Sequence, residues 1–181
     1  MDKVVIVDED DRPLGLEDRW KCHSGEGILH RAFSVLVFNR EGQLLLQQRS
    51  KNKLLWPLCW ANTCCSHPFE GESYEQAGRR RLQTEMGFVC HLRLIGTFRY
   101  QASYEDRGLE NEMCAVLVGE YDGEVNPDPE EVADWKWMDF EEVRRDVAVH
   151  PDKYSPWFKI EIQKFFGSGQ QHGSGPMATA S

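Results

Sequence analysis

Apolar residues in the first part of the chain form short runs that are separated by polar turn residues. Residues 4–7 predict a short strand, and residues 8–15 predict an acidic turn. The runs at 32–38 and 43–48 predict two strands joined by the glycine-containing loop 39–42. This region therefore predicts strands, including one β-hairpin.

The clearest helical pattern covers residues 73–86. Its first residues, Ser73-Tyr74-Glu75-Gln76, form a capping box, in which the serine and glutamine side chains bond backbone N–H groups at the helix start. Gly87 follows as a natural stop, because glycine readily takes the left-handed conformation that ends helices. Arg81 and Glu85 are four residues apart, so they are expected on one face of this helix.

Strands and helices continue through the rest of the chain. Three further strands are predicted, at residues 89–95, 97–103 and 112–118. Two further helices are predicted, one capped at residues 139–142 and one over residues 155–166. Residues 51–62 are expected to form a packed loop. Together these elements predict an α/β (α+β) domain with a mixed β-sheet sandwiched between helices.

The length of 181 residues favours a single domain. We predict that this domain covers residues 1–166, and we find no internal repeat. Residues 167–181 (GSGQQHGSGPMATAS) are rich in glycine and serine, which predicts a flexible C-terminal tail or a vector-derived extension.

Composition and charge exclude several classes of protein. The formal net charge of −9 argues against a nucleic-acid partner, which would need a basic face. No apolar run is long enough to span a membrane, and the N-terminus does not resemble a secretory signal, so we expect a cytoplasmic protein. The six cysteines include no Cys-x-x-Cys pair, so most are expected to be core residues. We also expect a monomer.

Two glutamates and three histidines are candidate metal ligands. Glu110 and Glu112 alternate along a strand, so their side chains face the same side. A solvated strand edge is one interpretation, but the rest of the strand is apolar, and buried paired carboxylates usually need a cation. His23, His30 and His67 are the candidate partners. Mixed nitrogen and oxygen ligands of this kind suit Mn²⁺, Fe²⁺ or Zn²⁺ better than Mg²⁺.

A cysteine and several cations are further candidates. Cys65 stands two residues before His67, and it is either a core residue or a reactive thiol in a polar, cationic setting. Arginine and lysine side chains also occur at Arg49, Lys51, Lys53 and Arg81. They form either a solvated surface or a phosphate-binding cluster.

One segment resembles a modified Nudix box. Gly71-Glu72 and Arg80 through Gly87 keep the frame of the loop and helix that holds a metal-bound diphosphate in that superfamily. Arg81 and Thr84 stand where a Nudix hydrolase would have glutamates, and Ser66 stands where it would have glycine. The resemblance implies chemistry next to a diphosphate instead of its hydrolysis.

The wider set of motifs resembles type I isopentenyl-diphosphate delta-isomerase, the metal-dependent, flavin-free isomerase with a Nudix fold. The resemblance covers about residues 3–166 and depends on motifs that are specific in combination: Trp60 through Pro68, Gly71-Glu72-Ser73, Arg80-Arg81, Glu85-Met86-Gly87 and Glu110-Asn111-Glu112. It implies an isomerase of isoprenoid biosynthesis, an intramolecular oxidoreductase that transposes a C=C bond between isopentenyl and dimethylallyl diphosphate.

The resemblance also implies roles for individual residues. The catalytic residues would be Cys65 on one face of the alkene and Glu112 with Tyr100 on the other. The first divalent metal (Mn²⁺, Mg²⁺ or Zn²⁺) would be bound by His23, His30, His67, Glu110 and Glu112. A second Mg²⁺ would arrive with the diphosphate and bind Glu85. The substrate would be bound by Arg19, Arg49, Lys53, Arg81 and Trp157.

The sequence departs from the family pattern at three positions. Arg19 replaces an expected lysine, Gln48 replaces a second expected arginine, and Ser66 replaces glycine. Two other functions remain alternatives. A Nudix hydrolase of a nucleoside diphosphate derivative would need the acidic residues that Arg81 and Thr84 replace, and a non-enzymatic diphosphate-binding module would not need Cys65, Tyr100 and Glu112.

Overall fold

The computed structural model describes residues 3–167. Its strands are β1 (Lys3–Val7), β2 (Pro13–Asp18), β3 (His30–Phe38), β4 (Gln43–Arg49), β5 (Trp60–Ala61), β6 (Cys64–Ser66), β7 (Leu92–Tyr104), β8 (Gly108–Glu120) and β9 (Val132–Asp139). Its helices are α1 (Arg19–Cys22), α2 (Tyr74–Met86), α3 (Phe140–Val149), the 3₁₀ turn η1 (Pro151–Lys153) and α4 (Pro156–Phe166). The tail predicted at 167–181 lies outside the described residues except for Gly167, which ends α4.

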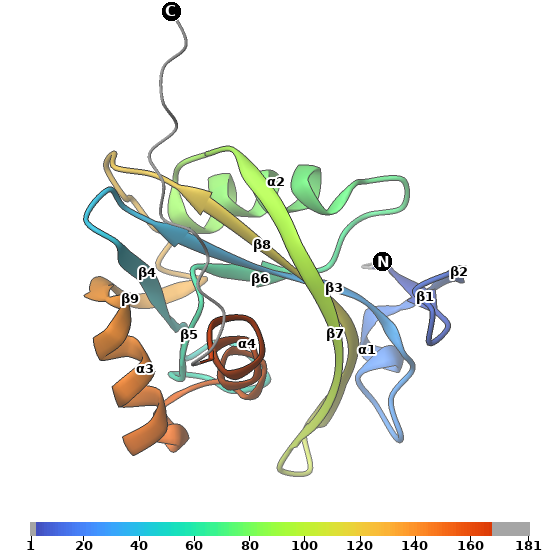
Figure 1. Cartoon of the computed structure of the whole chain (residues 1–181). Coiled ribbons are helices and arrows are strands. Elements are labelled where there is room, and N and C mark those ends of the chain that lie inside the picture. Colours follow the sequence, from blue (N-terminus) through green and yellow to red (C-terminus); the bar gives the residue numbers. More distant parts are fainter. Residues whose placement is uncertain (1–2, 168–181) are drawn as a thin grey trace, which may run out of the picture.

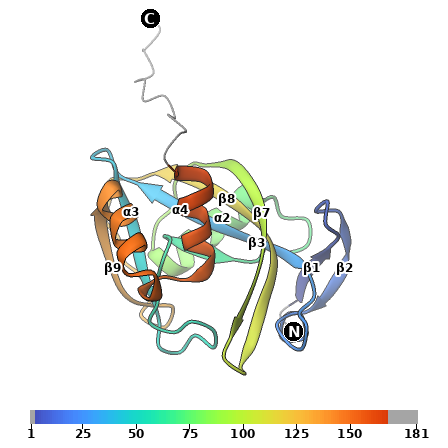
Figure 2. The same cartoon turned by 60° about the horizontal axis from the view of Figure 1, so that its bottom comes forward.

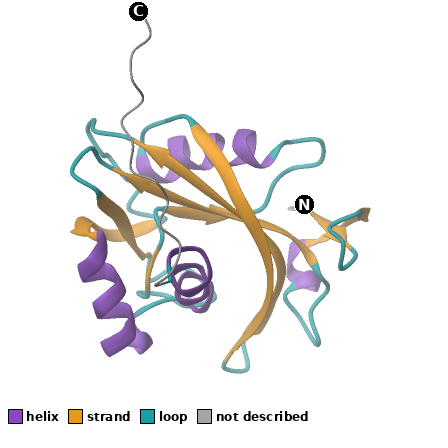
Figure 3. Ribbon diagram, in the orientation of Figure 1, coloured by secondary structure: helices purple, strands orange, loops and turns teal. Residues whose placement is uncertain are grey.

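The centre of the fold is strand β3, which is bonded to neighbours on both edges. One edge pairs in parallel with β8 along its whole length, from His30 opposite Glu112 to Phe38 opposite Glu120. The other edge pairs antiparallel with β1, β6 and β4 in turn. β7 extends the sheet beyond β8, and β9 extends it beyond β4. Figure 3 shows β7 and β8 as a long curved pair.

Helices cover both faces of this mixed sheet, as the sequence predicts (Figure 1). Phe33, Val35 and Val37 pack in the core cluster that includes α2. The alternate position Leu36 packs in the cluster that includes α3 and α4. Because successive side chains of a strand point to opposite faces, one apolar run can supply both cores. Figure 2 shows α4 lying across the sheet beside α3.

The α2 helix begins and ends where its sequence predicts. Ser73 and Gln76 form the capping box, with the Ser73 hydroxyl accepting from the Gln76 N–H at 3.2 Å. Gly87 takes the left-handed conformation with φ 79°. A side chain there would also collide with the backbone oxygen of Asn126, because a Cβ would lie 2.4 Å from it. Gly87 is therefore needed for both its conformation and its contact.

Most of the predicted elements are confirmed, and several details of the prediction were wrong. The hairpin of β3 and β4 and the helices α2, α3 and α4 are present. The strands predicted at 89–95 and 97–103 are one strand, β7, with a register shift between Leu94 and Gly96. The turn predicted over 8–15 contains the start of β2, and the loop predicted over 51–62 contains β5. The sequence analysis also missed α1 and β9, because short or half-exposed elements carry a weak periodic signal.

One aspartate adds side-chain bonds between the N-terminal hairpin of β1 and β2 and the rest of the fold. Arg31 donates to Asp11 through its Nε at 2.7 Å, and the Tyr74 hydroxyl donates to the other Asp11 carboxylate oxygen at 3.0 Å. These bonds join the hairpin to β3 and α2. They hold α1, and with it the segment that carries Arg19 and His23, over one end of β3.

Glu161 is a fully buried carboxyl group in α4, and burial raises its pKa to about 8. Between pH 4.5 and about 8 the unfolded chain is ionised at this residue while the folded chain holds a proton, so wild-type stability should fall as pH rises through that window. We expect Glu161→Gln to remove this loss and to gain roughly 1–4 kcal/mol at pH 8.5 relative to pH 4. Urea unfolding at both pH values measures the difference; a parallel pH dependence in the two proteins would contradict the prediction.

No helix within residues 3–167 is long and apolar enough to cross a membrane.

Candidate active site

The register of four strands places the main candidate residues on one face of the sheet. In β3, His30 and Ser34 are four residues apart and share a face. His30 pairs with Glu112 of β8, and Ser34 pairs with Cys65 of β6. Tyr100 of β7 pairs in turn with Glu112. Cys65 and Glu112 therefore come from strands on opposite edges of β3 and project toward the side that α4 covers.

These side chains line one cavity of about 520 Å³. Cys65, Glu112, Tyr100 and Trp157 are all among its lining residues, so the thiol and the carboxylate face a shared space. The lining also includes Arg19, His23, Arg49, Lys53, His67, Arg80, Arg81, Glu110, Glu130 and Glu131.

Three imidazoles and one carboxylate converge at one end of this cavity. The candidate ligand atoms of His23, His30, His67 and Glu112 all lie within 4.8 Å of one another. His67 Nε2 lies 3.0 Å from Glu112 Oε1 and 3.2 Å from His30 Nε2. Predicted ligand Glu110 is not part of this group.

Backbone carbonyls orient two of the imidazoles. His30 Nδ1 lies 2.8 Å from the Ile28 oxygen, and His23 Nδ1 lies 2.9 Å from the Leu109 oxygen. A carbonyl oxygen can only accept, so each Nδ1 donates a hydrogen to it, and this bond fixes the orientation of the ring. The Leu109 N–H also donates to the His23 oxygen at 3.1 Å, which holds His23 against β8 from two sides.

The charges of this group suit a divalent cation. Burial and the neighbouring imidazoles lower the pKa of His23 to about 4, and burial lowers the pKa of His67. Burial alone would raise the pKa of Glu112, but hydrogen bonds from His30 and His67 hold it well below its usual range. Imidazoles beside an ionised carboxylate are the donor set that transition metals bind. The residues present therefore fit a metal ion.

Glu110, Glu112 and Tyr100 form a hydrogen-bonded group beside the metal-binding residues. The Tyr100 hydroxyl lies 2.6 Å from Glu112 Oε2 and also contacts Glu110 Oε2 closely. Burial and the adjacent Glu112 raise the pKa of Glu110 to about 8. Burial and the same two carboxylates raise the pKa of Tyr100. These three groups can exchange protons among themselves over short distances.

Cys65 lies beside a cation on the other side of the cavity. Arg49 Nη1 lies 3.8 Å from the Cys65 sulfur. Burial nevertheless raises the pKa of Cys65 to about 12, against the opposing effect of Arg49. The residue is therefore a neutral thiol that carries its proton at physiological pH.

Trp157 closes the cavity from α4. Its indole Nε1 donates to Asn62 Oδ1 at 2.9 Å, and the ring packs edge-on against Trp56 at 5.6 Å between ring centroids. The Arg49 guanidinium carbon lies 5.1 Å from the Trp157 ring centroid. The indole face is thus already next to one positive charge, which is the environment that a π system stabilises.

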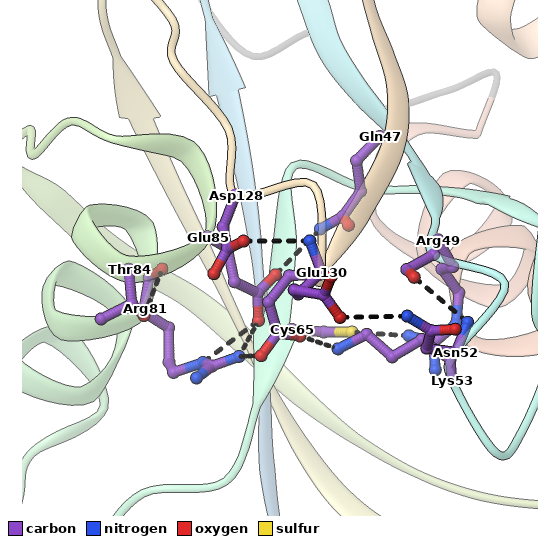
Figure 4. Close-up of polar contacts among 12 residues, drawn as sticks. Gln47, Arg49, Asn52, Lys53, Cys65, Arg81, Thr84, Glu85, Asp128 and Glu130 are labelled. Atoms are coloured by element: carbon purple, nitrogen blue, oxygen red, sulfur yellow. Dashed lines mark hydrogen bonds and ion pairs between the residues drawn. The ribbon is translucent and has the colours of Figure 1, made fainter.

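The cations at the mouth of the cavity are bonded to carboxylates. Arg81 shares a face of α2 with Glu85, as the sequence predicts, and forms an ion pair with it. Glu131 contacts both Arg81 and Lys53. Figure 4 shows Arg81 and Lys53 approaching this region from opposite sides. Thr84, in place of an acidic residue, bonds only backbone oxygens of its own helix among the contacts described.

The loop before α2 keeps a strong internal ion pair. Arg80 donates to both oxygens of Glu72, at 2.8 Å in each case, in a bidentate arrangement. The same guanidinium lies 3.3 Å from the His67 backbone oxygen. This pair therefore fixes the segment that carries His67 against the helix.

The structure brings most predicted site residues together and separates Lys51 and Glu85 from them. Arg19, Arg49, Lys53 and Arg81 line the cavity, but Lys51 is exposed outside it. Gln48 donates to the Leu58 oxygen and does not line the cavity. Glu85 is buried beneath Arg81 and Gln47, which both donate to its carboxylate. The sequence analysis missed Glu131, because no motif marks a carboxylate that reaches two cations from a distant loop.

Comparison with known proteins identifies the class of protein domain that has this fold. The NUDIX domain family matches residues 28–158. Solved structures agree in fold: one protein of Deinococcus radiodurans superposes with a TM-score of 0.67 at 20% identity, over 82% of this chain and 90% of that one. A MutT protein of Methanosarcina mazei gives a TM-score of 0.65 at 17% identity, over 79% and 96%. The chain has a Nudix domain.

Curated relatives identify the family to which this Nudix protein belongs. An isopentenyl-diphosphate Delta-isomerase of Burkholderia multivorans is 43% identical over 163 residues, which covers 90% of this chain and 92% of that protein. One of Nocardia farcinica is 46% identical over 155 residues, covering 85% and 89%. This chain belongs to the isopentenyl-diphosphate Delta-isomerase family.

Proposed function

We propose that the protein interconverts isopentenyl and dimethylallyl diphosphate by adding one proton and removing another. Curated relatives with this name at 43% and 46% identity support the proposal. The observation that carries it is the shared cavity, in which Cys65 faces Glu112 and Tyr100 from the other edge of β3. The reaction moves the double bond by one carbon and needs an acid and a base at different carbons of one small molecule.

The two sides of the cavity supply these groups. The Cys65 thiol carries a proton, and the Tyr100, Glu110 and Glu112 group can hold or release one. Protonation of the terminal alkene carbon leaves positive charge on the tertiary carbon, and loss of a proton from the next carbon forms the new double bond. Placing acid and base on opposite walls completes both steps without turning the substrate over.

The walls of the cavity also protect the positive charge. Water would trap a carbocation, so the prenyl group must react in a dry space. Trp157 and Tyr100 are both nearly fully buried and present aromatic faces there. The Trp157 ring can stabilise a desolvated cation by about 2 kcal/mol.

We propose that His23, His30, His67 and Glu112 hold one divalent metal ion, with Glu110 as the predicted fifth ligand. When bound, the metal would draw electron density from Glu112 and increase the acidity of groups hydrogen-bonded to it. Mn²⁺, Mg²⁺ and Zn²⁺ remain the candidates, no flavin is required, and a second Mg²⁺ near Glu85 is proposed to accompany the diphosphate. The convergence of one ring nitrogen from each histidine with a Glu112 oxygen supports the first site.

Arg19, Arg49, Lys53 and Arg81 are proposed to bind the diphosphate. They come from four separate segments and line the same cavity, although the protein as a whole is strongly acidic. Local cations can outweigh distant acidic residues, because salt screens charges beyond about 8 Å at physiological ionic strength. We further propose that the enzyme is a cytoplasmic monomer whose catalytic domain is residues 1–166.

Incubation with isopentenyl diphosphate in deuterated water tests the proposal. We expect deuterium to enter the methyl group of dimethylallyl diphosphate and, through the reverse reaction, the remaining isopentenyl diphosphate, as measured by NMR and mass spectrometry. No deuterium uptake by metal-loaded protein would argue for a binding module. Release of phosphate from a nucleotide panel, without uptake, would argue for a hydrolase.

A further inference from the structure

One carboxylate in the cavity mouth contacts two of the cations proposed to bind the diphosphate. Glu131 Oε2 forms an ion pair with Lys53 Nζ, and Glu131 Oε1 lies 3.3 Å from Arg81 Nη2. Lys53 lies in the loop after β4, Arg81 in α2, and Glu131 immediately before β9. All three side chains line the cavity. The carboxylate of Glu131 thus stands where phosphate oxygens would meet these cations.

The main chain around Glu131 is held in place, so its side chain is the part that can move. The Glu131 N–H donates to the Asp128 oxygen at 3.0 Å, and the Glu131 oxygen accepts from the Ser50 N–H at 3.0 Å. The Asp128 N–H donates to the Glu85 oxygen at 2.9 Å, which attaches this loop to the last turn of α2. Rotating the Glu131 side chain away breaks its ion pairs but none of these backbone bonds.

The charge on Glu131 makes it a competitor for an anion. Burial would raise its pKa, but Lys53 and Arg81 hold that pKa below its ordinary range, so the carboxylate is ionised at neutral pH. A carboxylate and a phosphate offer the same kind of oxygen acceptors to a guanidinium or ammonium group. Both anions cannot occupy the same donors of Lys53 and Arg81 at once.

We propose that Glu131 is an anion placeholder in the diphosphate subsite, and that the diphosphate of the substrate displaces its carboxylate from Lys53 and Arg81. The inference rests on the proposed function, because it assumes that these cations bind diphosphate. The placeholder keeps the two cations in position in the substrate-free protein. Any anion must break these ion pairs in order to bind, so the placeholder lowers the affinity of the subsite for every anion. Ligands that make few contacts of their own are therefore excluded first.

Titration calorimetry of the metal-loaded full chain with inorganic diphosphate and Mg²⁺ tests the placeholder. Glu131→Gln keeps the size of the side chain and removes its charge. We expect the variant to bind diphosphate about 5–10-fold more tightly, because two partly exposed ion pairs no longer have to be broken. Unchanged or weaker binding would overturn the proposal. Thermal unfolding checks that the variant is folded.

Glu130→Gln is the matched control. Glu130 is the adjacent residue and also lines the cavity, but its carboxylate accepts from the Asn52 amide at 3.1 Å. Glu130→Gln removes the same charge from the same loop, and we expect it to change the affinity for diphosphate by less than about twofold. If it tightens binding as much as Glu131→Gln, net charge explains the effect and the placeholder is refuted.

The diphosphate subsite and the role of Glu131 can be refuted separately. If wild-type protein does not bind inorganic diphosphate, the assignment of the subsite is wrong. If wild-type protein binds it with the same affinity as Glu131→Gln, only the role of Glu131 is wrong. Deuterium uptake into isopentenyl diphosphate, measured on the same wild-type preparation, tests the isomerase activity independently of either result.

Discussion

Cys65→Ala is expected to reduce isomerisation by roughly 10²–10⁴-fold while the protein stays folded. Burial raises the pKa of the thiol to about 12, so at neutral pH the residue carries a proton that it can deliver into the cavity. Alanine cannot transfer a proton. Tyr100 and Glu112 cannot take over the role of Cys65, because their strands lie at the opposite edge of β3. Initial rates with isopentenyl diphosphate measure the loss.

The neighbouring cysteine provides the control for this prediction. Cys64 has nearly the same sequence position but points to the other face of the sheet, into the core cluster that includes α2. Cys64→Ala should cost stability, about 1 kcal/mol, but leave turnover within about threefold of wild type. Near-wild-type turnover by Cys65→Ala, with the substitution verified by mass spectrometry, would refute the assignment of Cys65 as a catalytic residue.

Glu112→Gln is expected to lose both bound metal and turnover. One Glu112 oxygen lies 3.0 Å from His67 Nε2 and the other lies 2.6 Å from the Tyr100 hydroxyl, so the carboxylate belongs to the metal-binding group and to the proton-exchanging group. Glutamine keeps the shape but supplies one oxygen and no charge. We expect turnover to fall by roughly 10²–10⁴-fold, and metal content to fall when measured by mass spectrometry after dialysis.

Two comparisons make the metal part of this prediction specific. Glu120 lies on the same strand but is exposed, so the Glu120→Gln protein should keep its metal and its activity. Wild-type protein treated with a chelator should lose activity and recover it on addition of Mn²⁺ or Mg²⁺. Full metal content and normal turnover in Glu112→Gln would contradict the assignment, and the metal content of Glu110→Gln tests the predicted fifth ligand.

The sequence alone predicted the parts of the fold that depend on local interactions. The capping box at Ser73 and the stop at Gly87 define α2, and alternating apolar runs define β3 and β4. These signals depend on residues a few positions apart, so they can be read along the chain. Two elements were missed: α1, because four residues carry too weak a periodic signal, and β9, because it is half exposed and pairs with the distant strand β4.

Cys65, His67 and Glu112 were found as candidates because each belongs to a distinctive motif, and the register of β3 explains how they meet. For Glu85, the tertiary structure adds what the sequence did not indicate. Sequence spacing correctly predicted that it shares a helix face with Arg81, but only the tertiary structure shows that Glu85 is buried beneath Arg81, which itself lines the cavity. The second Mg²⁺ at Glu85 therefore remains a prediction.

The amino-acid sequence by itself determined the family, the helix and strand pattern, and the residue types available for catalysis, because these are properties of neighbouring positions and of motif identity. The tertiary structure decided that Cys65 and Glu112 face one cavity and that Glu131 reaches Lys53 and Arg81. Those contacts join segments that are far apart in the chain, and their distances are set by the pairing of β3 with β6 and β8 and by the loop that enters β9.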